Sequence, residues 1–136
     1  MKKILIVGAG GQIGSELVPY LRGIYGTDNV VATDVRECTG LSEEGPFETL
    51  DALDGKAMEA IVSKYGIDTI FNLVALLSAT GERNPQLAWK INMGALMNSL
   101  EIGREHNCAV FTPSSIGAFG PTSPEDMTLQ DTVMQP

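Results

Sequence analysis

The sequence predicts an α/β fold in which helices cover both faces of a doubly wound parallel sheet. Two observations support this prediction. Short apolar runs of strand length alternate along the chain with longer segments of helical periodicity. The first run, Ile4–Val7, leads straight into the glycine-rich segment Gly8–Gly14 and then into a helical segment. Because a strand that turns through glycines into a helix is typical of a Rossmann-type sheet, we expect one dinucleotide-binding domain over residues 1–136.

The first strand and helix follow from the placement of apolar residues. Lys2–Val7 is predicted to be the first strand, and Gln12–Ile24 the first helix. Helical spacing places Leu17 and Leu21 on one apolar face of that helix. Pro19 perturbs the middle of the helix because proline has no N–H to donate.

Two further strands are predicted over Val30–Asp34 and Phe47–Asp51. The segment between them, Thr39–Pro46, is rich in Gly, Ser and Glu and predicts a loop. Gly55–Tyr65 then predicts a helix. Its expected inward-facing residues are Ala57, Ala60 and Ile61.

The last predicted strands are Thr69–Ala75 and Ala109–Ser114. The first of them is almost fully apolar, as expected for a strand with helices on both faces. Leu76–Asn84 predicts a loop and Pro85–His106 a long helix, whose apolar stripe would pack on the sheet. The stripe consists of Leu87, Ile91, Leu96, Met97 and Leu100. Because Thr122–Pro136 predicts no element, we expect a sheet truncated after its fifth strand.

The glycine segment is spaced for a nucleotide. Gly8 and Gly11 allow a tight turn and a close approach of the backbone to a pyrophosphate, and Gly14 lets the helix pack close to the sheet. The N–H groups at the start of the helix, at Gln12 and Ile13, would face the phosphates. The spacing departs from the G-x-G-x-x-G pattern and reads G-x-x-G-x-x-G.

Acidic residues at strand ends predict the remainder of the cofactor site. Asp34 follows the glycines at about the 20-residue distance expected of an acid that binds the ribose hydroxyls, and the alternative is a solvated strand end. Its charge favours NAD over NADP, although Arg36 nearby could accommodate a 2′-phosphate. Asp51 could accept from the adenine amino group, and Asp54 could do so or cap a helix. The predicted cofactor-binding residues are Gly8, Gly11, Gln12, Ile13, Gly14, Asp34, Asp51, Ala52, Leu73 and Ala75.

The composition excludes several classes of function. The formal net charge of −8 disfavours nucleic acid and anionic membranes as partners, because both bind basic surfaces. The apolar runs are too short for a membrane span or a signal peptide. Cys38, Cys108 and the lone His106 have no metal-ligand spacing, so no metal site is predicted. A reduced, cytoplasmic protein is therefore expected.

These motifs together resemble the extended short-chain dehydrogenase/reductase superfamily. The resemblance rests on the glycine segment, Asp34, Asp51, Asn92 and the segments Asn72–Ala75 and Pro113–Gly120. Within that superfamily, Leu76–Trp89 is similar to the corresponding segment of short-chain L-threonine 3-dehydrogenases, as are Gly45–Phe47 and Phe119–Thr122. The resemblance implies NAD-dependent oxidation of L-threonine to 2-amino-3-ketobutyrate, in a homodimer that pairs through the long helix.

The same resemblance implies roles for four residues. Ser115 would orient the substrate hydroxyl, and Ser114, Ser78 and Gly81 would approach the substrate or the nicotinamide. From spacing alone, the two serines after the fifth strand could instead be strand-end caps.

One departure from the family pattern concerns the general base. In the family this base is the Tyr of a Tyr-x-x-x-Lys motif, but no Lys follows Tyr20, Tyr25 or Tyr65 at that spacing. We therefore expect the 136-residue chain to be an incomplete, inactive enzyme. The alternatives are a nucleotide-sugar epimerase or dehydratase of the same superfamily and a non-catalytic NAD-binding module.

Overall fold

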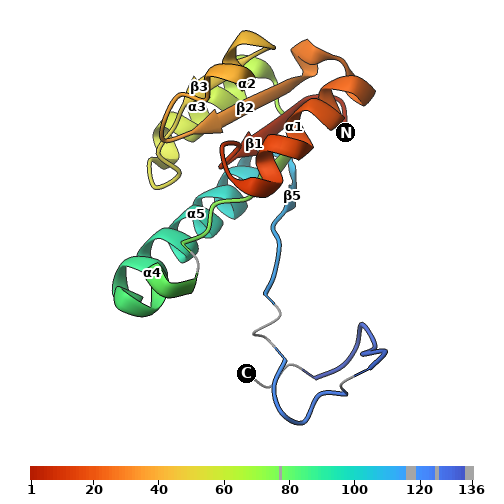
Figure 1. The fold of residues 1–136 in the computed structure, drawn as a ribbon. Coiled ribbons are helices and arrows are strands. Elements are labelled where there is room, and N and C mark those ends of the chain that lie inside the picture. The colour runs from red at the N-terminus through yellow and green to blue at the C-terminus, as the bar shows by residue number, and fades with distance from the viewer. Residues whose placement is uncertain (77, 116–118, 125, 134–136) are drawn as a thin grey trace.

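A computed structural model describes residues 1–76, 78–115, 119–124 and 126–133, apart from the side chains of Ser78 and Ala79. Its centre is a parallel five-stranded sheet with the order β3-β2-β1-β4-β5 (Figure 1). The strands are β1 (Ile4–Val7), β2 (Val30–Asp34), β3 (Phe47–Thr49), β4 (Thr69–Asn72) and β5 (Ala109–Phe111). The α-helices are α1 (Gln12–Tyr25), α2 (Thr39–Glu43), α3 (Gly55–Tyr65), α4 (Ser78–Arg83) and α5 (Pro85–His106), and a 3-10 turn spans Thr27–Asn29. The predicted α/β Rossmann-type sheet is confirmed.

The strand order changes direction after β3, because the next strand, β4, pairs with the other edge of β1. The strands before this point lie on one side of β1, and those after it lie on the other side. The crevice between the two halves opens at the carboxyl ends of β1 and β4, where open sheets of this kind bind ligands. The described residues after Phe111 form no helix or strand, and they extend away from the sheet (Figure 1).

Two segments predicted as loops contain short helices. α2 forms because a turn of hydrogen bonds from Leu41 and Ser42 to the Cys38 carbonyl buries the side chain of Leu41. The sequence did not predict this helix because its Gly and Ser residues are typical of a loop. α4 likewise occupies most of the predicted loop Leu76–Asn84.

Three strands end earlier than predicted because their partner strands end there. The β2–β3 ladder stops at Asp34 and Thr49, with a last bond from Leu50 N to Asp34 O. The β1–β4 ladder stops at Val7 and Asn72, since the chain turns away at Gly8. β5 ends at Phe111, the last residue that pairs with β4.

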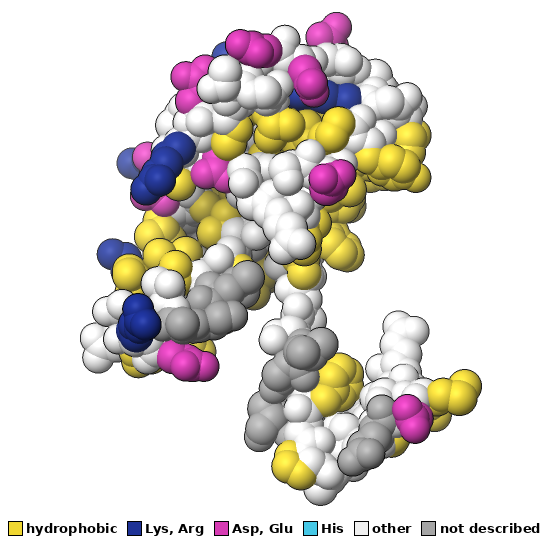
Figure 2. Space-filling model, viewed as in Figure 1, with side chains coloured by type: hydrophobic (Ala, Val, Ile, Leu, Met, Phe, Trp, Pro, Cys, Tyr) yellow, Lys and Arg dark blue, Asp and Glu magenta, His cyan; other side chains and the backbone are white. Residues whose placement is uncertain are grey.

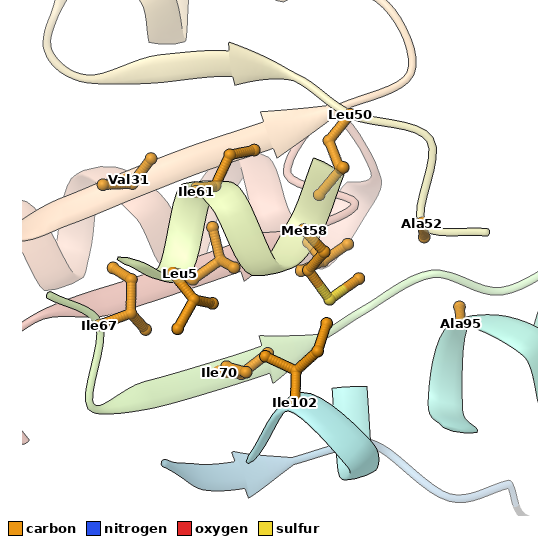
Figure 3. Close-up of a cluster of buried hydrophobic side chains, with 12 residues drawn as sticks. Leu5, Val31, Leu50, Ala52, Met58, Ile61, Ile67, Ile70, Ala95 and Ile102 are labelled. Atoms are coloured by element: carbon orange, nitrogen blue, oxygen red, sulfur yellow. The ribbon is translucent and has the colours of Figure 1, made fainter. Parts of the chain in front are cut away.

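Two apolar clusters, one on each face of the sheet, hold the layers together. One cluster lies under α3 and α5 and the other under α1 and α2. In the first, Met58 and Ile61 of α3 meet Ile70 of β4 and Ile102 of α5 (Figure 3). The inward face of α3 consists of Met58, Ile61 and Val62, so the expectation for Ala60 is wrong: it is exposed, on the solvent side of the helix. On α1, Leu21 is buried and Leu17 is half-buried.

α5 packs on the sheet through small residues and not through its predicted apolar stripe. Its buried residues are Ala95, Ser99, Ile102 and Gly103. A Cβ atom on Gly103 would lie only 2.5 Å from Val110 Cγ2, so glycine allows the helix to approach β5. Of the predicted stripe, Leu87, Met97 and Leu100 are exposed, and apolar side chains gather at the surface over α5 (Figure 2). The expectation that the stripe packs on the sheet is therefore wrong for these three residues, whereas Ile91 and Leu96 are half-buried.

Candidate cofactor site

The carboxyl ends of the strands enclose a cavity of about 400 Å³. Its walls come from the glycine turn, the ends of β2 and β4, the β3–α3 loop and the first turns of α5. Seven predicted cofactor residues line it: Gly8, Gly11, Asp34, Asp51, Ala52, Leu73 and Ala75. Gln12, Ile13 and Gly14 are not part of this lining. Gln12 and Ile13 are exposed at the start of α1, and Gly14 is buried beneath the turn.

The glycine turn brings the backbone close to the cavity. Gly8 has φ of +84°, and a Cβ atom there would lie 3.1 Å from Val74 N. The N–H groups of Gly8 and Ala9 both donate to Thr33 O at 2.9 Å, which fixes the turn to β2. Gly11 is the N-cap of α1 and provides no side-chain cap. The start of α1 therefore keeps unbonded N–H groups that can bind an anion.

Asp34 is held at the end of β2 by the glycine turn. Its Oδ2 accepts from Gly10 N at 2.9 Å. The Cys38 thiol lies against the same place, because a Cβ atom on Gly10 would be 2.6 Å from Cys38 Sγ. Burial, and then the charges of Asp34 and Glu37, raise the pKa of this thiol. The carboxylate therefore faces a neutral thiol and lines the cavity as an acceptor for hydroxyl groups.

The β3–α3 loop forms another wall of the cavity. Asp51 Oδ1 accepts from Leu53 N at 2.9 Å, and Asp54 N donates to Asp51 O at 2.8 Å. Asp54 is the N-cap of α3, with its Oδ1 accepting from Ala57 N at 3.0 Å. Of the two roles predicted for Asp54, the structure shows the cap, while Asp51 lines the cavity.

Two asparagines of α5 tie the loops of the site to one helix. Asn92 Oδ1 accepts from Leu76 N at 2.7 Å, and its Nδ2 donates to Leu76 O at 3.3 Å. Asn98 Nδ2 donates to Ala52 O at 2.8 Å. The sequence reasoning used Asn92 only as a family motif and did not include Asn98. A half-buried asparagine among apolar helix residues is the signal that could have identified both.

Three of the predicted substrate residues, Gly81, Ser114 and Ser115, lie outside the cavity lining. Ser114 and Ser115 follow β5 and are exposed, whereas Gly81 is half-buried in α4. The side chain of Ser78 is outside the described part of the structure. The described residues contain no group of three His, Cys, Asp or Glu side chains that could hold a metal ion. No described helix is long and apolar enough to cross a membrane.

The fold and the cavity at the carboxyl ends of the strands are typical of proteins that bind a dinucleotide. The chain belongs to the NAD dependent epimerase/dehydratase family, whose sequence profile matches residues 4–136. NAD is thus its cofactor, and the residues that line the cavity fit it: the backbone at Gly8 and Gly11 would lie close to a pyrophosphate, and Asp34 would offer an acceptor to a ribose.

Comparisons with individual proteins place the chain within this family. It is 54% identical over 138 residues to an uncharacterized epimerase/dehydratase of Staphylococcus saprophyticus, covering all of this chain and 43% of the relative. It is 52% identical to the solved L-threonine dehydrogenase of Clostridium difficile, with a TM-score of 0.93, covering all of this chain and 43% of that one. A UDP-glucose 4-epimerase from Thermotoga maritima is 26% identical over 85% of this chain and 38% of its own, with a TM-score of 0.75. The chain spans less than half the length of these relatives.

Proposed function

We propose that the protein containing this chain oxidises L-threonine to 2-amino-3-ketobutyrate with NAD, and that the present residues supply the cofactor half of the enzyme. One observation carries the proposal: similarity to L-threonine dehydrogenases extends along the whole chain at 52% identity, compared with 26% for the UDP-glucose epimerase. The curated relatives bear an epimerase/dehydratase name, so a nucleotide-sugar epimerase or dehydratase is the second candidate.

The residues have separate roles in this proposal. NAD, when bound, would supply the acceptor for the hydride on the carbon that carries the substrate hydroxyl. Ser115 donates a hydrogen bond to the oxygen of that hydroxyl, and Ser114, Ser78 and Gly81 contact the amino acid. Because the chain has no Tyr-x-x-x-Lys motif, a general base must come from elsewhere in the protein. We therefore expect no turnover by the 136 residues alone.

The test measures NADH formation from NAD and L-threonine by absorbance. The 136-residue chain is compared with the same chain continued to the length of its solved relatives. We expect activity only in the longer chain, and Ser115→Ala in that chain should lower kcat about 100-fold or more, since preorganised donors of this kind contribute 10²–10³. Activity with a nucleotide sugar but not with L-threonine would favour the epimerase candidate. Binding of NAD without turnover of any substrate would favour a binding module.

The exposed face of α5 supports a homodimer. Trp89 is 70% exposed and Met97 53%, and with Leu100 they form an apolar stripe that this chain leaves uncovered. Burying such a stripe against a second copy would remove it from water. We expect twice the monomer mass for the longer chain in sedimentation equilibrium, and a monomer for the double variant Met97→Glu, Leu100→Glu. A wild-type monomer would contradict the dimer.

A cytoplasmic location is part of the same proposal. Its support is that Cys38 and Cys108 are both free thiols, as is usual in a reducing compartment.

A further inference from the structure

α5 contacts the β3–α3 loop at two positions that are one helical turn apart. A Cβ atom on Gly94 would lie 2.5 Å from Leu53 Cδ2, so glycine lets the Leu53 side chain lie directly against the helix. Four residues later, Asn98 Nδ2 donates to the Ala52 carbonyl oxygen at 2.8 Å. The Asn98 amide also lies close to the first residue of α3, since a Cβ atom on Gly55 would be 3.2 Å from Asn98 Oδ1.

The loop held in this way is one wall of the cavity. Asp51, Ala52 and Leu53 all line the cavity. Within the loop, Leu53 N donates to Asp51 Oδ1, so the position of the backbone sets the direction of the acidic side chain. Ala52 is only 7% exposed, and its carbonyl oxygen would lose a partner if the Asn98 amide were removed. A shift of the Ala52 backbone would therefore move both Asp51 and Leu53.

We infer that Asn98 is a positioning residue for the adenine end of NAD, acting through the Ala52 carbonyl and assisted by the close approach at Gly94. Asn98 does not line this cavity, although it lines an adjoining hollow that shares Asp51 and Leu53 with it, and we assign it no direct contact with the cofactor. The inference rests on NAD as the cofactor and not on L-threonine as the substrate. It assigns Asn98 of α5 to the adenine half of the site, while Asn92 of the same helix holds Leu76 beside the end of β4.

The test uses the chain continued to the length of its relatives and measures the Kd of three probes by calorimetry: NAD, 5′-AMP and nicotinamide mononucleotide. For Asn98→Ala we expect AMP and NAD to bind about fivefold to tenfold more weakly, which is the effect of one lost hydrogen bond. Nicotinamide mononucleotide should bind as it does to the wild type. Asn98→Asp, which keeps the shape but cannot donate when ionised, should behave in the same way.

A second variant tests the same contact without touching the hydrogen bond. Gly94→Ala should displace Leu53 and weaken AMP binding, again with nicotinamide mononucleotide unaffected. The matched control is Glu101→Gln on the same helix, whose side chain is 60% exposed and pairs with Arg104; it should leave all three affinities unchanged.

The outcomes separate this inference from a purely structural role and from the proposed activity. Equal weakening of all three probes, together with a lower Tm, would show that Asn98 only stabilises the fold. Unchanged AMP binding in both Asn98 variants, or no AMP binding by the wild type, would also overturn the inference. Failure to oxidise L-threonine would leave these AMP affinities unaffected and would count only against the proposed substrate.

Discussion

Replacement of Gly14 by alanine is expected to abolish NAD binding. A Cβ atom at this position would lie 2.5 Å from Ala9 O and 2.6 Å from Ala9 Cα, and both of these are backbone atoms that cannot rotate away. The helix start and the glycine turn would have to separate, which moves the N–H groups of α1 away from the pyrophosphate. Overpacking of this kind costs roughly 3 kcal/mol. Calorimetric titration with NAD and a thermal melt of the longer chain measure the two effects.

The same helix provides the control for this prediction. Gly23 is exposed and would bring a Cβ atom within 4 Å of nothing. Gly23→Ala should therefore stabilise the protein by roughly 0.5–1 kcal/mol, the usual gain from removing a helical glycine, with NAD affinity unchanged. Normal NAD binding by Gly14→Ala would show that the turn can adapt and that close packing of α1 does not require glycine at this position.

The fold was predictable because its signals are local and repeated. Each crossover combines an apolar run of strand length with a helical period, and the glycine turn marks where the first strand ends. Strand ends were less predictable, because a ladder stops where the partner strand stops: Phe47–Asp51 was predicted as one strand, but its pairing with β2 ends at Thr49, opposite Asp34. The helix α2 was not predicted because few residues are needed to form it. One buried residue, Leu41, and a pair of hydrogen bonds are enough to form it.

The sequence predicted the part of the candidate site that is formed by the glycine turn and by the acidic residues at the strand ends. Gly8, Asp34 and Asp51 all line the cavity as their positions in the sequence indicate. The part contributed by α5 was not predictable, since it depends on which face of a long helix turns inward. The apolar pattern suggested Leu87 and Met97, yet small residues such as Ala95 and Ser99 pack on the sheet. The orientation of α5 that turns Ala95 and Ser99 toward the sheet also brings Asn92 and Asn98 to the loops of the site.

Replacement of Asp34 by asparagine is expected to change the choice of cofactor. The wild-type carboxylate would accept from the 2′-hydroxyl of NAD and repel the 2′-phosphate of NADP. Asparagine can still accept from Gly10 N, so the turn bonded at 2.9 Å should persist. It loses the charge, however, and a hydrogen bond to a charged group contributes about 1.5–3 kcal/mol. NAD should therefore bind roughly 10- to 100-fold more weakly.

NADP should bind more tightly to Asp34→Asn than to the wild type, because the repulsion is gone and Arg36 follows two residues later. Paired titrations with NAD and NADP give the ratio of the two affinities, which is the quantity that Asp34 controls. Asp51→Asn is the matched control, since Asp51 lines the cavity and is predicted to face the adenine, where the two cofactors are identical. It should weaken both and leave their ratio unchanged. An unchanged ratio in Asp34→Asn would mean that the ribose is held elsewhere and that this carboxylate serves only to fix the glycine turn.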